Sequence, residues 1–266
     1  MPSFDPVVAV GRGIEILRVV NELSEATISQ IHQKTGIHQS TILRMLETLI
    51  HNGYVVRRVE RASYIPTGKC LQLSNGLRKL SRLLEIATPT VSSCQKSIGW
   101  PVDMAVFDND AMVTIATDRK FGAMSLNRTI GDRLPLLGSS LGRAYLAFCS
   151  EDEQDAILKR LANSKTTWDR KAKNRRRLLK DLNEIRANGY ATGDVDYRIE
   201  VYDGALGGLA VPVLTGQKVA ASIGVTFLNE SMSIDEGVTR YFKRLQQAAD
   251  EIASAIVAEF GYFSPV

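Results

Sequence analysis

Residues 27–54, TISQIHQKTGIHQSTILRMLETLIHNGY, constrain the fold of this chain more than any other stretch. Thr27 is a good helix N-cap, and Gly36 suits the left-handed conformation that ends a helix at a sharp turn. The segment after the glycine has one apolar face at helical spacing, formed by Ile42, Leu43, Leu46, Leu49 and Ile50. Two short helices around a glycine turn are typical of a helix-turn-helix, whose second helix enters the DNA major groove. Helical hairpins with no role in DNA binding share this pattern, so that alternative stays open here.

The residues that follow predict a basic β-hairpin. Residues 54–66 read as two short strands with a turn between them, and they carry Arg57, Arg58 and Arg61. Residues 1–80 hold 10 Lys and Arg against 6 Asp and Glu, so the whole formal net charge of +4 lies in this part of the chain. A basic hairpin beside a recognition helix indicates a wing that contacts DNA phosphates.

The polar face of the second helix is the candidate for DNA recognition. We expect base edges or nearby phosphates to be contacted by Gln39, Ser40, Thr41 and Arg44. Arg forms two hydrogen bonds with guanine, and Gln forms two with adenine. Arg57 and Arg58 would instead contact phosphates, which sets affinity and not sequence preference.

Length and composition exclude several classes of protein. A chain of 266 residues suits two domains, and it has no apolar run long enough to span a membrane. The N-terminus lacks the pattern of a secretion signal, so we expect a cytoplasmic protein. Cys70, Cys94 and Cys149 are odd in number and far apart, which argues against a disulfide framework or a zinc finger. We expect no metal and no other cofactor.

The rest of the chain predicts a linker and a second domain of mixed structure. Leucines at helical spacing over residues 68–84 indicate a linker helix, which would pack against a second copy or against its own chain. We expect the domains to be residues 1–69, the linker 70–84 and the second domain 85–266. Strands are predicted at 102–107, 111–116, 123–127, 209–214 and 219–227, and helices at 10–23, 86–98, 136–148, 151–161, 170–188 and 233–260. This order indicates an α+β fold, in which helices cover a mainly antiparallel sheet.

Signatures of catalysis are missing from the sequence. His32, His38 and His51 all lie in the first domain, so the second has no histidine base for a serine or cysteine nucleophile. No Walker loop or metal-ligand spacing is present, and we predict that the chain is not an enzyme. Two alternatives stay open: an enzyme acting on an aromatic acid with a helical oligomerisation segment, and an architectural DNA-binding protein without a ligand.

Several strings, in order along nearly the whole chain, resemble IclR-family transcriptional regulators: VGRGIEIL, TGIHQSTILRMLETLIHNGYV, GDRLPLLGSSLGRAYLAF, GYATGDVD and GGLAVPVLTGQKVAASIGV. The resemblance implies an N-terminal winged helix-turn-helix, a linker helix and a C-terminal effector-binding domain with a GAF/PAS-like fold. It also implies a homodimer or homotetramer on a double-stranded DNA operator, with RNA polymerase as a further partner. WPVDMAVFD and RLPLLGSSLGRAYLAFCSE look most like regulators of aromatic-acid catabolism, such as the hydroxyphenylpropionate regulator.

By the same resemblance, the effector pocket would be lined by Leu134, Ser140, Leu141, Leu206, Gly208, Gly224 and Thr226. Sensors of small acids in this family have a cysteine and two serines where this chain aligns Gly208, Gly224 and Thr226. The departure favours a larger, flatter ligand than glyoxylate, and we expect a small aromatic carboxylic acid. A small non-aromatic organic acid is the alternative.

An aromatic acid needs a flat apolar slot and one anchor for its carboxylate. The anchor candidates are Arg133, Arg128 and the helix-start amides around Ser139 and Ser140. Arg133 would otherwise form a structural salt bridge with Asp132 or another acid. Apolar walls would come from Trp100, Met104, Phe107 and Tyr145, for which plain core packing is the alternative. The basic run over residues 170–177 reads better as a solvated helix face than as a second DNA-binding patch.

Overall fold

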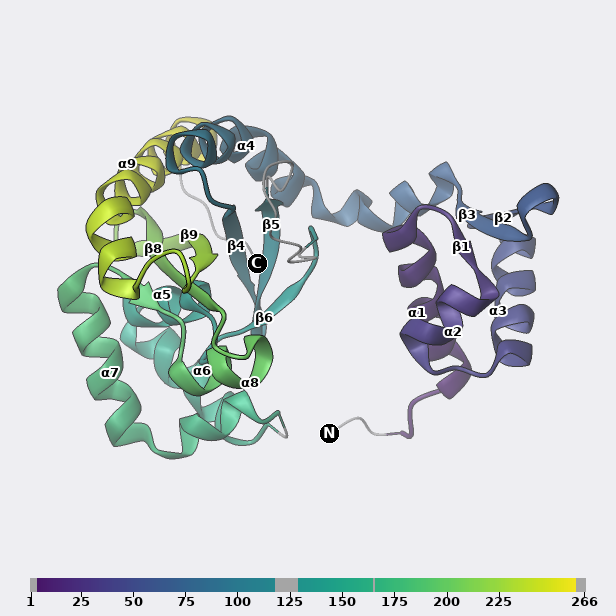
Figure 1. Ribbon diagram of the computed structural model, residues 1–266, viewed down its shortest axis with the longest axis horizontal. Coiled ribbons are helices and arrows are strands. Elements are labelled where there is room, and N and C mark those ends of the chain that lie inside the picture. The colour runs from purple at the N-terminus through teal and green to yellow at the C-terminus, as the bar shows by residue number, and fades with distance from the viewer. Residues whose placement is uncertain (1–3, 118–128, 165, 262–266) are drawn as a thin grey trace. The chain divides into compact units, whose positions relative to one another are not determined.

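The computed structural model describes residues 4–117, 129–164 and 166–261, and it divides into two compact units, residues 1–78 and 79–266 (Figure 1). Each unit has a hydrophobic core of its own. The predicted strand at 123–127 and Arg128 lie outside the described residues.

The first unit is a small helical domain with a three-stranded antiparallel sheet in the order β1-β3-β2. Its elements are α1 (Val8–Leu23), β1 (Ala26–Thr27), α2 (Ile28–Thr35), α3 (Gln39–His51), β2 (Val55–Arg58), the 3-10 turn η1 (Val59–Arg61), β3 (Ser63–Pro66) and the 3-10 segment η2 (Gly68–Leu77). The β2–β3 hairpin, with η1 at its tip, confirms the predicted wing.

The predicted start and end of α2 are confirmed by its caps. The Thr27 side chain accepts a hydrogen bond from the backbone N–H of Gln30, and the Gln30 side chain accepts one from the Thr27 N–H at 2.8 Å. Gly36 ends the helix with a φ of 67°, which costs glycine little because it has no Cβ. These caps fix the turn that leads into α3.

The core of the first unit fixes which face of α3 is free. Ile42 and Leu46 are fully buried against α1 and α2, and each large apolar side chain buried in this way contributes about 1.5–3 kcal/mol. Leu43 was expected on the same apolar face, but it is 39% exposed because it lies one position past the buried stripe.

The second unit has a six-stranded antiparallel sheet in the order β6-β5-β4-β9-β8-β7. Its strands are β4 (Val102–Asp108), β5 (Ala111–Thr117), β6 (Arg133–Pro135), β7 (Ala191–Thr192), β8 (Leu206–Thr215) and β9 (Lys218–Leu228). Its helices are α4 (Arg78–Ile98), α5 (Ser140–Phe148), α6 (Glu151–Ala162), the 3-10 turn η3 (Trp168–Lys173), α7 (Arg175–Asn188), α8 (Val195–Tyr202) and α9 (Ile234–Phe260).

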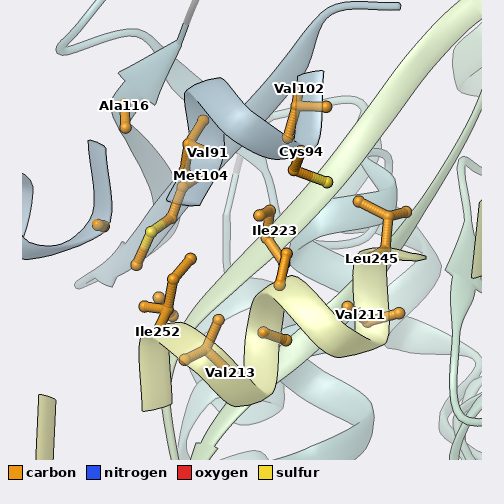
Figure 2. Close-up of a cluster of buried hydrophobic side chains, with 14 of the residues drawn as sticks. Val91, Cys94, Val102, Met104, Ala116, Val211, Val213, Ile223, Leu245 and Ile252 are labelled. Carbon is orange, nitrogen blue, oxygen red and sulfur yellow. The ribbon is translucent and has the colours of Figure 1, made fainter. Parts of the chain in front are cut away.

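Helices cover both faces of this sheet, as Figure 1 shows. α4 and α9 pack on one face, and Figure 2 shows Met104 of β4 in this cluster with Val91 of α4 and Ile252 of α9. The other face packs against α5, α6 and α7. The predicted α+β architecture is therefore confirmed, and the sheet separates two apolar layers.

The helices differ from the prediction in three places. Residues 68–77 form a 3-10 segment, and one helix then continues through Pro89 to residue 98. The helix expected over 170–188 breaks at Asn174, whose side chain caps α7 by accepting from the Arg177 N–H. No helix was predicted over the residues of α8, whose valine, isoleucine and tyrosine side chains favour extended structure.

Candidate functional site

The first half of α3 carries the four residues predicted to meet DNA. Gln39, Ser40 and Arg44 are exposed and Thr41 is half-buried. The described residues place no acidic side chain within salt-bridge distance of Arg44. His38 caps the helix, and its Nδ1 lies 2.8 Å from the Ser40 hydroxyl, so Ser40 already has a local hydrogen-bond partner.

The three arginines of the wing differ in whether they form an ion pair. Arg61 pairs with Glu25 at 3.5 Å, and that carboxylate also accepts a 2.6 Å hydrogen bond from Ser63, which lowers the pKa of Glu25. Arg57 and Arg58 are exposed on β2 with no ion pair among the described residues. Two cations at the wing and one on α3 are therefore left for solvent or phosphate.

A hollow lies in the second unit between the start of α5, the helix α8 and the strands β8 and β9. We call it the α5–α8 hollow, and it is lined by Ser139, Ser140, Leu141, Gly193, Tyr197, Arg198, Tyr202, Leu206, Gly207, Gly208 and Thr226. Five of the residues predicted for the effector pocket come together here: Ser140, Leu141, Leu206, Gly208 and Thr226. The hollow is narrow, with a volume of about 30 Å³.

The start of α5 gives this hollow a polar end. Ser139 caps the helix by accepting from the Gly142 N–H at 3.0 Å, and its hydroxyl donates to the Pro135 carbonyl at 2.9 Å. The first amides of a helix have no partner within the helix and carry partial positive charge, so they attract anions. A Cβ on Gly142 would lie 2.5 Å from the Leu136 Cα, so only glycine permits this close approach.

Arg198 of α8 gives the same hollow a cationic side chain, which the sequence reasoning missed. Arg198 is half-buried, and its Nε donates to the Gly193 carbonyl at 3.2 Å. No acidic group among the described residues forms an ion pair with it. Tyr197 and Tyr202 stand beside it, with ring centroids 5.7 Å apart, and Tyr197 also packs edge-on against Trp168 at 4.9 Å. The hollow thus combines a guanidinium, helix-start amides and aromatic side chains.

Arg133, which was predicted to anchor a carboxylate, has a different setting. It lies on β6 and donates to the carboxylates of Asp108, at the end of β4, and Asp110, in the turn that follows, which raises its pKa. The geometry favours the salt-bridge alternative, with Asp108 and Asp110 in place of Asp132.

The remaining predicted lining residues do not face the α5–α8 hollow. Met104 packs on the opposite face of the sheet, against α4 and α9, which is the core-packing alternative that the sequence left open. Leu134 is buried in the core beside α5, and Gly224 lies where a Cβ would be 2.8 Å from that of Ala210. Tyr145 is buried and donates to Glu153 at 2.5 Å, and burial raises the pKa of Tyr145.

Two of the predicted aromatic walls also pack elsewhere. Trp100 packs against the cluster beneath α4 and α9, 6.5 Å edge-on from Phe227. Phe107 stacks on Tyr145 at 4.9 Å. Both side chains fill apolar layers, which is the alternative that the sequence left open.

Within 4–117, 129–164 and 166–261, no group of three or more His, Cys, Asp or Glu side chains is arranged to hold a metal ion. Over the same ranges, none of the helices is both long and apolar enough to cross a membrane.

Comparisons with known proteins match both units of the chain. Residues 9–58 match the family model described as IclR helix-turn-helix domain, and residues 78–254 match the one described as Bacterial transcriptional regulator IclR C-terminal. The HTH-type transcriptional regulator KdgR of Escherichia coli is 27% identical over 261 residues, which cover 97% of this chain and 94% of that relative.

Two solved structures have the same fold over nearly the whole chain. The Thermotoga maritima IclR structure has a TM-score of 0.69 at 22% identity, covering 97% of this chain and 100% of that one. An IclR homologue from Microbacterium hydrocarbonoxydans, solved in complex with 4-hydroxybenzoate, has a TM-score of 0.66 at 20% identity and covers 94% and 99%. At these identities the likeness establishes the fold alone.

Proposed function

Because the chain belongs to the IclR family of bacterial transcriptional regulators, we propose that α3 and the wing bind an operator and that the α5–α8 hollow binds a small aromatic carboxylic acid. We assign DNA binding to residues 1–69, the linker to 70–84 and effector binding to 85–266. The protein would act in the cytoplasm, where it meets its operator.

The DNA-binding proposal depends on the exposed polar face of α3. Gln39, Thr41 and Arg44 project from the first half of the helix, the part that contacts base edges in this motif. Arg44 lacks an acidic partner among the described residues, so its guanidinium is free to form the two hydrogen bonds that guanine accepts. Arg57 and Arg58 would contact phosphates from the wing and contribute affinity.

The effector proposal depends on Arg198 and the start of α5, which meet at one hollow. A carboxylate placed there would accept hydrogen bonds from the guanidinium and from the Ser140 and Leu141 amides. Tyr202 and Leu206 offer an aromatic and an apolar surface for the rest of the ligand. The Microbacterium homologue holds 4-hydroxybenzoate, which illustrates that this fold accommodates such a ligand without identifying the effector of this chain.

A small non-aromatic organic acid is the second candidate for the effector. The observation that favours it is the volume of the hollow, about 30 Å³, which suits a compact acid better than a ring. An aromatic acid would require α8 to move outward, and Tyr197 and Tyr202 would move with it. The same anchor serves both ligands, so only a binding comparison separates the two.

Regulation requires that the acid bind two conformations of the protein with different affinity. We propose a homodimer or homotetramer on a pseudo-palindromic operator, because helix-turn-helix proteins read two half-sites with two copies of the recognition helix. The bound acid would change DNA affinity or contact with RNA polymerase.

Two measurements test the proposal. A thermal-shift screen of hydroxybenzoates, protocatechuate, hydroxyphenylpropionates and short aliphatic acids should find one class that raises the melting temperature, since a ligand of the folded state stabilises it. A gel-shift assay with upstream DNA should show a salt-sensitive, sequence-selective complex that this acid modulates. Absence of any selective complex would end the regulatory proposal, and turnover of the acid would favour an enzyme.

A further inference from the structure

A second cavity, of about 270 Å³, lies in the second unit and shares no lining residue with the α5–α8 hollow. We call it the α7 cavity. Its charged lining comes from α5, η3, α7 and the start of α8, and consists of Arg143, Lys171, Arg177, Asp181, Asp194 and Asp196. Leu137 and Leu178 add apolar surface. A wider cleft of about 440 Å³ adjoins it and adds Glu184 and Asp235.

The charges in the α7 cavity are unevenly paired. Lys171 is satisfied, because its Nζ lies 2.7 Å from both oxygens of Asp194 and 2.7 Å from Asp196. Arg143 is not, since its one ion pair among the described residues is a 3.5 Å contact with the same Asp194. The Asp181 side chain forms no hydrogen bond or ion pair within those residues, although its charge acts on Arg143.

Arg143 is the cation of the described second unit whose buried side-chain nitrogen lacks a hydrogen-bond partner. Its side chain is only 16% exposed, and its buried Nε has no hydrogen-bond partner among the described residues. Burial lowers the pKa of Arg143 from its ordinary value. A buried guanidinium is costly unless an anion and hydrogen bonds compensate it, and Asp194 is already shared with Lys171.

Arg177 stands at the same cavity from the first turn of α7 and is exposed, with no ion pair among the described residues. Two incompletely paired guanidinium groups therefore line the cavity with the Asp181 carboxylate, whose charge acts on Arg143 without forming an ion pair. The six charged side chains sum to zero, but Lys171 engages two of the three carboxylates, so hydrogen-bond donors of the two guanidinium groups are left for a ligand. An arginine guanidinium often binds a carboxylate through two parallel hydrogen bonds.

We propose that the α7 cavity is a second ligand site, and that it binds a small organic monocarboxylate between Arg143 and Arg177. The carboxylate supplies the hydrogen-bond acceptor that the buried Nε of Arg143 lacks. The hydrocarbon part of the ligand packs against Leu137 and Leu178. The site is separate from the effector site, so one chain binds two acids.

The two sites are linked through Asp194. This residue lines the α7 cavity and also caps α8, where its Oδ1 accepts a 3.1 Å hydrogen bond from the Tyr197 N–H. Tyr197 and Arg198 of α8 line the α5–α8 hollow. An acid that draws Arg143 away from Asp194 changes the start of the helix that holds the effector anchor. By linkage, the effector then changes affinity at the α7 cavity by the same factor.

Calorimetric titration of the full-length chain with benzoate tests the proposal. An Arg198→Ala background disables the first hollow, and we expect it to retain one benzoate site per chain. Adding Arg177→Ala should weaken that site about tenfold or more, because charge-assisted hydrogen bonds are lost. Arg176→Ala is the matched control, since Arg176 is the exposed neighbour that does not line the cavity.

Asp181→Asn should change the benzoate affinity in the opposite direction from Arg177→Ala. A variant that failed to fold would not bind benzoate more tightly, so this outcome cannot come from loss of folding. Removing its negative charge should tighten benzoate binding in the Arg198→Ala background. The proposal is overturned if that background binds no benzoate, if Arg177→Ala and Arg176→Ala behave alike, or if Asp181→Asn weakens binding.

Discussion

Replacing Arg198 with alanine should remove most of the affinity for the effector acid and leave the fold intact. The Nε of Arg198 is engaged with the Gly193 carbonyl, so its two terminal nitrogens remain for a carboxylate. Charge-assisted hydrogen bonds contribute about 1.5–3 kcal/mol. The side chain is half-buried and partly screened by solvent, so we take about 2 kcal/mol for the pair, which corresponds to a roughly 30-fold increase in Kd.

The assay is a calorimetric titration with the acid that gives the largest thermal shift in the screen. Arg133→Ala is the control, because the Arg133 guanidinium is occupied by Asp108 and Asp110. Its effector Kd should not change, and an exposed pair of this kind adds less than about 1 kcal/mol to stability. Arg198→Ala also loses one hydrogen bond, at a cost of about 1 kcal/mol in unfolding free energy. The reasoning fails if Arg133→Ala loses effector affinity while Arg198→Ala binds like the wild type.

Three further predictions concern the DNA-binding unit and the packing of α5. Arg44→Ala should relax base preference at one operator position by about 1–3 kcal/mol, and equal selectivity across operator variants would count against its role. Arg57→Ala with Arg58→Ala should lower the salt dependence of log K by about 1.8 while preserving base preference, and an unchanged slope would exclude phosphate contacts. Gly142→Ala should destabilise the chain by about 1–3 kcal/mol in a urea titration, because its Cβ would meet backbone at 2.5 Å. Gly76→Ala, with nothing within 4 Å, is the control, and equal stability of the two variants would contradict the packing argument.

The sequence was most informative where one local rule decides the structure. Thr27 and Gly36 mark the ends of α2 through cap chemistry, and the wing follows from β-formers around a turn. The exposed face of α3 followed from its buried stripe. The hollow was anticipated in part, because Ser140, Leu141 and Gly208 belong to strings that carry the family resemblance.

The misassigned residues depend on contacts that the local sequence does not contain. β4 is buried on both faces, so alternation along the strand could not tell which layer Met104 enters. Arg198 was missed because α8 is rich in strand-forming side chains, and its helix is held by the Asp194 cap and by tertiary packing. The partners of Arg133 come from a turn more than twenty residues earlier in the chain.

The edges of the larger sheet have a consequence for how copies of this protein associate. Among the described strands, β6 at one edge has three residues and β7 at the other has two. Such short rows of free backbone groups offer little to an incoming strand, and short edge strands are one way in which proteins prevent aggregation through sheet extension. We therefore expect self-association to proceed through side-chain surfaces on helices, and cross-β aggregation to require prior unfolding of the second unit.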